Sequence, residues 1–166
     1  MKNIVTVFAI LWLVVPAAYS QVGIELGPKL GFDVAGDVEE PFIGLDARFS
    51  TTLPVIINPT FDYYFTEENF TLWQIALHAL YEFGVANEMF TPYAGGGISL
   101  TRSSFDLPDD PFFDDIDASD SSVGLNGIAG AKFPVGGVDL FGQVQLTVGD
   151  VDMVALAVGA LFSLGN

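Results

Sequence analysis

The most constraining feature of this chain is the strict alternation of its last long segment, residues 154–164. Every second residue from Val154 to Leu164 is apolar, and four of the five residues between them are Ala, Gly or Ser. Successive side chains of a β-strand point to opposite faces, so the pattern predicts a strand with one large apolar face and one face of small residues. Such a strand suits a wall with lipid on one side and a crowded interior on the other.

The same period of two recurs in most of the preceding segments of the chain. Residues 90–101 are instead rich in glycine. Segments of this length suit a tilted strand across a hydrocarbon layer, which needs about 9–11 residues. An even number of antiparallel strands can close into a barrel that leaves no edge unpaired in lipid. We therefore predict an all-β fold, an eight-stranded antiparallel up-and-down transmembrane β-barrel. Its segments are residues 22–33, 43–50, 55–65, 73–83, 90–101, 123–133, 139–148 and 154–164.

The N-terminus has the features of a secretory signal peptide. Lys2 provides a positive start, residues 4–15 are almost entirely apolar, and Pro16 ends the run. Ala18 and Ser20 place small residues at the two positions that signal peptidase reads. We predict cleavage after Ser20, so that residues 1–20 are the signal peptide and residues 21–166 are the barrel. The alternative, a membrane anchor, suffers from a short apolar run with no basic cluster after it.

Charge excludes several classes of partner. Removal of residues 1–20 takes away one of the five basic residues and none of the 21 acidic ones, which leaves a net charge of −17. Nucleic-acid binding requires a basic surface, and so does attachment to anionic lipid through Lys and Arg. The chain has no Cys, so it has neither disulfides nor a lipidated cysteine.

A water-soluble barrel also alternates, but it would turn its apolar face inward around a ligand cavity. Two observations favour the membrane. The less apolar face carries few charges, and the aromatic residues fall into two bands, as expected at the two membrane interfaces. With the N-terminus in the periplasm, the lower band holds Phe49, Tyr81, Phe83, Phe90, Phe133 and Phe162, and the upper band holds Phe32, Tyr63, Phe65 and Trp73. This topology predicts short lower turns at 52–54, 84–88 and 134–137, and upper loops at 34–41, 66–69, 102–120 and 150–152.

Short glycine-rich motifs resemble those of the small eight-stranded outer-membrane barrels of Gram-negative bacteria, of the OmpA-like or opacity-protein type. They are Thr91-Pro-Tyr-Ala-Gly-Gly-Gly-Ile98, Gly124-Leu-Asn-Gly-Ile-Ala-Gly-Ala131 and the C-terminal Gly159-Ala-Leu-Phe-Ser-Leu164. The last is similar to the signal that the barrel-assembly machinery reads, although this chain ends on Asn166 rather than on an aromatic residue. The resemblance covers the whole mature chain and implies the fold; it implies no cell-wall tether, because a peptidoglycan-binding domain is missing.

The clearest candidate site is a polar network inside the barrel. Three of the four basic residues of the mature chain fall on inward faces, next to acidic residues on neighbouring strands, so we expect ion pairs that plug the lumen. The alternative is a polar pathway for ions or small solutes. The predicted inward-facing residues are Glu25, Lys29, Asp33, Asp46, Arg48, Asp62, His78, Glu82, Lys132 and Asp139.

The long upper loop is acidic. Its aspartates suggest calcium binding, with Asp115, Asp117 and Asp120 as candidate ligands. The segment lacks the central Gly and the distal Glu of a dedicated calcium loop, so we expect a solvated acidic loop instead. Phe105, Phe112 and Phe113 in the same loop suggest a contact with a partner or with the barrel mouth.

The sequence favours no enzyme. His78 is the only histidine and would have to be the base of any Ser/His/acid triad, with Ser50 on a neighbouring strand as the open candidate for the nucleophile. No phosphate-binding loop and no metal-ligand spacing occurs, and we expect no cofactor. We expect a structural or surface-interaction protein of the cell outer membrane; the alternatives are a narrow porin-like channel and, third, a lipid-modifying enzyme. The expected partners are outer-membrane lipid, the barrel-assembly machinery during biogenesis and an extracellular partner, but no nucleic acid.

Overall fold

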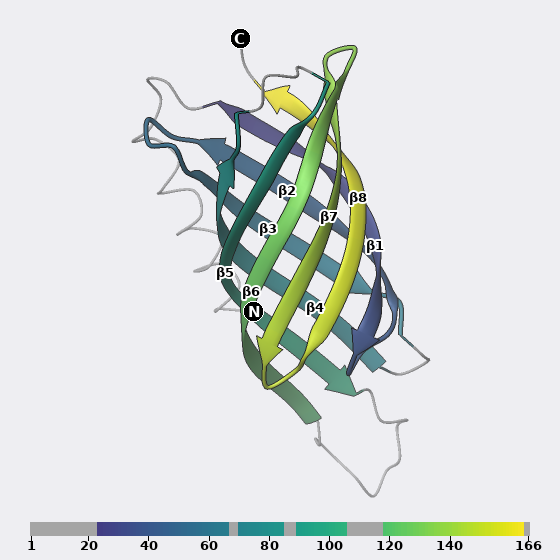
Figure 1. Ribbon diagram of the computed structural model, residues 1–166. Helices are drawn as coiled ribbons and strands as arrows, with labels where there is room; N and C mark the ends of the chain where they lie inside the picture. Colours follow the sequence, from purple (N-terminus) through teal and green to yellow (C-terminus); the bar gives the residue numbers. More distant parts are fainter. Residues whose placement is uncertain (1–22, 67–69, 85–88, 106–117, 165–166) are drawn as a thin grey trace, which may run out of the picture.

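The computed structural model describes residues 23–66, 70–84, 89–105 and 118–164. Within them the chain forms one closed barrel in which every strand pairs antiparallel with its neighbours in sequence, and β8 closes on β1 (Figure 1). The prediction of an eight-stranded antiparallel barrel is confirmed. The described residues include no helix that is long and apolar enough to cross a membrane. The strands are β1 (Ile24–Gly36), β2 (Pro41–Ser50), β3 (Ile56–Tyr64), β4 (Phe70–Glu82), β5 (Thr91–Phe105), β6 (Ala118–Val135), β7 (Val138–Gly149) and β8 (Met153–Leu164).

The barrel is apolar outside and polar inside. Leu30 and Leu125 on the outer wall are 60% and 68% exposed, whereas Asp46 and Arg48 in the lumen are 0% exposed. This distribution is the reverse of that in a water-soluble barrel, so the soluble alternative does not fit the structure. The alternation in the sequence arises because each strand separates a hydrocarbon-facing side from a packed, hydrogen-bonded interior.

The two ends of the barrel differ. We call the end with residues 51–55, residues 136–137 and the end of β8 the turn end, and the opposite end, with residues 37–40 and 150–152, the loop end. At the turn end, Gly136 and Gly137 have φ values of 59° and 92°. A type I′ hairpin turn, which matches the twist of the strands, needs positive φ at both central positions, and two glycines therefore join β6 to β7.

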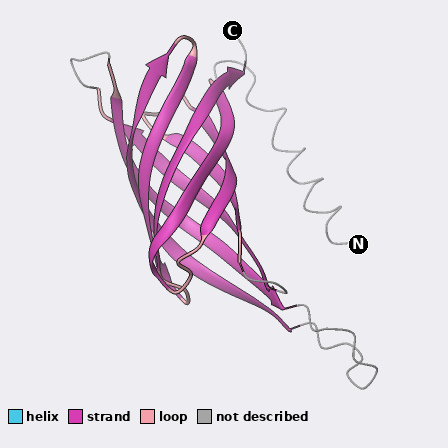
Figure 2. Cartoon of the chain, turned by 90° about the vertical axis from the view of Figure 1, so that its right-hand side faces the viewer, coloured by secondary structure: helices cyan, strands magenta, loops and turns pink. Residues whose placement is uncertain are grey.

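The predicted third upper loop is too long. β5 continues through Arg102 to Phe105, and β6 already begins at Ala118, so Ser103 pairs with Asp120 inside the ladder. Residues 118–123 of β6 pair with β5 but not with β7, and the β5–β6 hairpin extends past the rim at the loop end (Figure 2). The sequence pattern hides this extension because its residues are polar on both faces.

Both aromatic bands have exposed members on the outer wall. Near the turn end Tyr81 packs edge-on against Phe83, and near the loop end Tyr63 packs edge-on against Phe65. Aromatic side chains gather at the two water–lipid interfaces of membrane barrels, so the bands mark the borders of the apolar wall.

Candidate functional site in the barrel lumen

The lumen is filled by polar side chains that hydrogen-bond to one another. They arise from inward positions of strands β1 to β7 and are buried, since lipid-facing and lumen-facing residues alternate. The buried polar and charged residues are Lys29, Asp33, Asp46, Arg48, Asn58, Thr60, Asp62, Gln74, His78, Ser99, Thr101, Asn126, Lys132, Gln143, Gln145 and Thr147.

An ion-pair cluster lies at the turn end. Lys132 Nζ lies 2.6 Å from Glu82 Oε1 and 3.4 Å from Glu25 Oε2, and Glu25 also contacts Asp139. The lysine on β6 thus joins carboxylates of β1 and β4 across the lumen. The side chains of Lys132, Glu25 and Glu82 keep 11%, 15% and 28% of their surface exposed, so the cluster forms the polar rim of the interior.

Arg48 occupies the next layer towards the loop end. Its Nε donates to Asp46 Oδ1 (3.1 Å) and its Nη2 donates to the Tyr93 hydroxyl (3.0 Å). The guanidinium carbon lies 4.3 Å from the centre of the Tyr93 ring and 4.9 Å from that of Phe141. The Tyr93 hydroxyl in turn donates to Gln143 Oε1 at 2.9 Å. A planar cation between two rings is well suited to a buried site, since an arginine is less strongly hydrated than a lysine.

A chain of amides and one imidazole crosses the lumen from β5 to β2. Ser99 Oγ donates to Asn126 Oδ1 (3.0 Å), and Asn126 Nδ2 lies 2.9 Å from His78 Nε2. His78 Nδ1 lies 3.3 Å from Asn58 Oδ1. Since an amide nitrogen only donates, Nε2 of His78 accepts and Nδ1 carries the proton of a neutral ring.

Asn58 completes this chain at β2. Its Nδ2 donates to Asp46 Oδ1 and to the backbone carbonyl of Ala47, both at 2.8 Å. The hydrogen bonds therefore run in one direction, from the Ser99 hydroxyl to the Asp46 carboxylate. Such a network holds each ring and amide in one orientation.

On the loop-end side of this hydrogen-bonded chain, the two walls of the lumen differ in charge. On β1 and β3, Lys29 Nζ lies 3.0 Å from each carboxylate oxygen of Asp62, with a well-oriented hydrogen bond to Oδ2. The opposite wall is uncharged: Gln74 donates to Thr101 (3.0 Å) and accepts from Gln145 (3.2 Å). The central lumen therefore combines two balanced ion pairs with a neutral amide and hydroxyl layer.

Apolar layers bound the polar column. At the loop end a buried cluster contains Phe42, Tyr64, Leu72, Met153, Ala155 and Ala157, with Val38, Phe70 and Val151 packed against it. Towards the turn end a second cluster contains Ile56, Leu80, Tyr93 and Ile128. Sequence reasoning did not predict these inward aromatic and aliphatic residues. The period of two could have identified two of them, since Phe42 lies two residues before the inward Gly44 and Tyr64 lies two residues after the inward Asp62.

Asp33 joins the loop end to the closing seam of the barrel. It is completely buried, and its two carboxylate oxygens accept from the backbone nitrogens of Val154 (2.9 Å) and Glu39 (3.4 Å). Asp37 and Asp152 exchange two further hydrogen bonds between the adjacent loops. These contacts hold residues 37–40 and 150–152 over the apolar layer.

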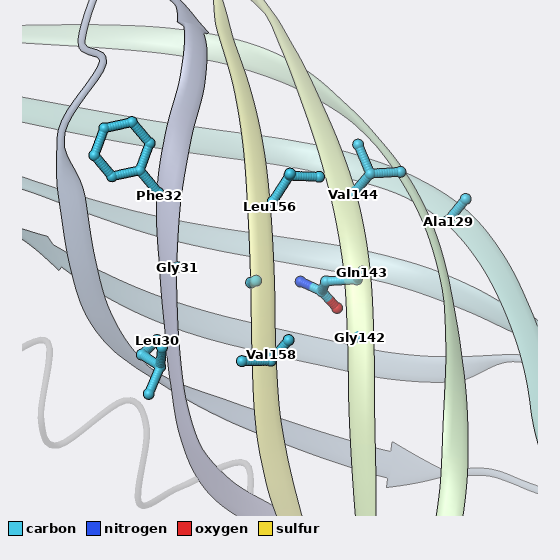
Figure 3. Close-up of a pocket in the computed structure, with 10 residues that line it drawn as sticks. Leu30, Gly31, Phe32, Ala129, Gly142, Gln143, Val144, Leu156 and Val158 are labelled. Carbon is cyan, nitrogen blue, oxygen red and sulfur yellow. The ribbon is translucent and has the colours of Figure 1, made fainter.

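Concave surface also occurs on the outer wall. A hollow of about 610 Å³ lies over β7, β8 and β1, with Leu30, Phe32, Leu156 and Val158 around it and the small Gly142 between them (Figure 3). These side chains point away from the lumen. The hollow is therefore part of the apolar, lipid-facing surface. The amide of Gln143, which also lines it, is buried and accepts a hydrogen bond from Tyr93 in the lumen.

The other candidate sites have different outcomes. Asp115 and Asp117 lie outside the described residues, as do residues 1–20 and the phenylalanines at 112 and 113. Asp120 is exposed at the start of β6 and accepts a hydrogen bond from the backbone of Ser121. Within the described ranges no group of three or more His, Cys, Asp or Glu residues has the geometry of a metal site. His78 is 1% exposed, and both of its ring nitrogens contact asparagine amides.

Comparison with known proteins identifies the architecture. Residues 11–153 match the family described as outer membrane protein beta-barrel domain. No curated protein sequence matches the chain.

Solved structures show the same fold at low sequence identity. The N-terminal β-barrel domain of Pseudomonas aeruginosa OprF has a TM-score of 0.63 and 17% identity, over 84% of this chain and 97% of that one. The Neisserial surface protein A has a TM-score of 0.63 and 20% identity, over 86% and 96%. Ail, the attachment invasion locus protein of Yersinia pestis, has a TM-score of 0.59 and 17% identity, over 86% and 97%. The fold is common to all three.

Proposed function

Because the chain belongs to the outer membrane β-barrel family, we propose that it is a structural or surface-interaction protein of the outer membrane, with a lumen closed to solutes and no catalytic activity. The observation that carries this proposal is the filled lumen. Ion pairs, amides and an imidazole occupy its centre, and apolar clusters lie on either side of them. An eight-stranded barrel is just wide enough for side chains to fill it.

Planar-bilayer recording tests this proposal. The refolded mature chain, without residues 1–20, should insert without reproducible conductance steps, because ions would have to displace paired buried charges. Insertion is verified separately by the shift of Trp73 fluorescence in lipid vesicles. Trp73 is the only tryptophan left after removal of the signal peptide. Reproducible conductance steps from inserted protein would contradict the closed lumen.

A narrow channel is the second candidate, and the polar side chains between the two apolar clusters, from Arg48 to Lys29, favour it. Conduction would require the apolar cluster at the loop end to open. The pair of variants Leu72→Ser and Leu77→Ser separates the two proposals, since Leu72 faces the lumen cluster and Leu77 faces outward. A channel gated by this cluster should conduct more with Leu72→Ser and be unchanged with Leu77→Ser. A structural plug should stay silent in both.

The lipid-modifying enzyme is the weakest candidate. A base must reach its substrate, and His78 is buried within the lumen and held by Asn58 and Asn126. We propose that His78 is structural. Cells that express His78→Gln should then have the same lipid composition as cells that express the wild-type chain, by mass spectrometry of outer-membrane lipids. A modification present only with the wild-type chain would contradict this.

We further propose that the chain is exported with cleavage after Ser20, is inserted by the barrel-assembly machinery, and meets an extracellular partner through its loop end. The loop-end rim supports the last point: Asp37, Glu39, Asp150 and Asp152 are exposed there. Mass spectrometry of the protein purified from outer membranes should give a chain that begins at Gln21. A chain that retains residue 1 would contradict cleavage.

A further inference from the structure

Three buried oxygen atoms on the lumen wall have no hydrogen-bond partner among the residues that the structure describes. They are Asp46 Oδ2, Thr60 Oγ1 and Asp62 Oδ1. Asp62 Oδ1 lies 3.0 Å from Lys29 Nζ, but this ion pair lacks the orientation of a hydrogen bond. Two other buried atoms, Arg48 Nη1 and Glu82 Oε1, also have no hydrogen-bond partner among the described residues. The three residues are 0%, 4% and 2% exposed. A buried polar atom without a partner carries its full desolvation cost, and such atoms in folded proteins are commonly satisfied by ordered water.

The three oxygens border the same stretch of wall. Asp46 on β2 is the register partner of Thr60 on β3, and Asp62 follows two residues later on the same face of β3. Directly opposite side chains start about 4.5–5.5 Å apart, and residues i and i+2 of a strand lie about 6.6 Å apart. One small molecule placed between the strands can therefore reach all three.

The charges around these oxygens define the molecule. Arg48 already neutralises Asp46, and Lys29 already neutralises Asp62. A metal cation would add an uncompensated charge to a buried site, and an anion would face two carboxylates. The two carboxylate oxygens need donors, and the threonine hydroxyl needs an acceptor. A neutral ligand with two donors and one acceptor satisfies all three atoms without adding a charge.

We propose that a single water molecule binds between Asp46, Thr60 and Asp62, donates to the two carboxylates and accepts from the Thr60 hydroxyl. Three hydrogen bonds are the usual number for a buried water. This water links β2 to β3 beside a gap in their ladder. No residues are paired between Asp46–Thr60 and Phe49–Ile57. The inference rests on the proposed closed lumen and names a component of it.

A crystal structure of the refolded barrel, at a resolution that shows ordered water, tests the site directly. The expected result is a density peak about 2.7–3.2 Å from all three oxygens. Absence of a peak overturns the proposal. So does a cation, which a crystal soaked in thallium acetate would reveal by its anomalous signal.

A matched pair of variants at Thr60 tests the water by stability, because Thr60→Val should destabilise the barrel only if the water is present. Thr60→Val keeps the shape and removes the hydroxyl, and Thr60→Ser keeps the hydroxyl. With the water present, Thr60→Val should raise the unfolding equilibrium constant in urea about tenfold, because the water loses a partner, and Thr60→Ser should change it by less than about threefold. Without the water, Thr60→Val removes only an unpaired hydroxyl, so an unchanged or lower constant overturns the proposal. If Thr60→Val does not fold, the wild-type density decides.

Conductance and density separate this inference from the proposed function. A conducting wild-type barrel contradicts the closed lumen, whatever the density shows. A silent barrel with no density peak leaves the closed lumen intact and overturns the water.

Discussion

Asn58 repairs a break that Pro59 causes in the ladder between β2 and β3. The pairing of Asp46 with Thr60 places Ala47 opposite Pro59, which has no backbone N–H to donate. The Asn58 side chain donates to the Ala47 carbonyl instead. A carbonyl without a partner is costly in a wall surrounded by lipid, so this amide has a structural task that no sequence pattern reveals.

Asn58→Leu should therefore destabilise the barrel by about 3 kcal/mol, because it leaves the Ala47 carbonyl without a donor and removes one of the two donors of Asp46 Oδ1. Adding Pro59→Ala should restore part of the loss, since alanine supplies the missing N–H. Urea unfolding in lipid vesicles, followed by Trp73 fluorescence, measures both. Equal stabilities of the single and double variants would refute the repair.

Arg48 and Tyr93 form the second prediction at this scale. Arg48→Lys keeps the charge but loses the hydrogen bond to the Tyr93 hydroxyl and the planar stacking, and should cost about 2 kcal/mol. Tyr93→Phe alone should cost about 1 kcal/mol. The double variant should cost less than the sum, because the shared bond is lost only once. Strict additivity in the same unfolding assay would show that the two side chains are not coupled.

At the scale of the strands, alternation assigns the faces wherever the two faces differ in polarity. It correctly placed Ile43 outside and Asp46 inside, because the two faces there differ in polarity. It failed where both faces are apolar: at Phe42–Ile43, Tyr63–Tyr64 and Leu72–Trp73 the period disappears, and the inward aromatic layer went unpredicted. Residues that act across strands, such as Asn58 with Ala47, depend on register, which a single sequence does not provide.

Gly97 on β5 shows how one strand accommodates the next. It is the register partner of His78, and a Cβ at Gly97 would collide with the backbone of Leu77 and His78. Gly127 on β6 faces outward, with no described atom near its missing Cβ.

Gly97→Ala should therefore lower the free energy of unfolding by about 3 kcal/mol or prevent folding, whereas Gly127→Ala should change it by less than about 1 kcal/mol. The comparison of the two in one unfolding assay removes the general effect of replacing a strand glycine. Similar losses in both variants would argue against close packing at His78.

For the whole molecule, the closed barrel predicts behaviour on gels. The folded chain, expressed without residues 1–20, should migrate faster unboiled than boiled, because a closed ladder keeps it compact in detergent. Deletion of residues 106–117, which follow β5 and precede β6, should preserve this shift and the β-type circular dichroism spectrum. The pairs between β5 and β6, which extend as far as Phe105–Ala118, involve none of the deleted residues. Loss of the shift in the deletion would mean that this segment is needed for closure.

The pairing of β8 with β1 also dictates when folding can finish. Strand β1 cannot pair on both sides until β8 is present, so a nascent or truncated chain without β8 keeps two unpaired edges and an incomplete wall. Closure is therefore an event that follows complete synthesis of the chain. Until then the edge of β1 is open to other partners, and a cell must shield or degrade every chain that stops before Met153.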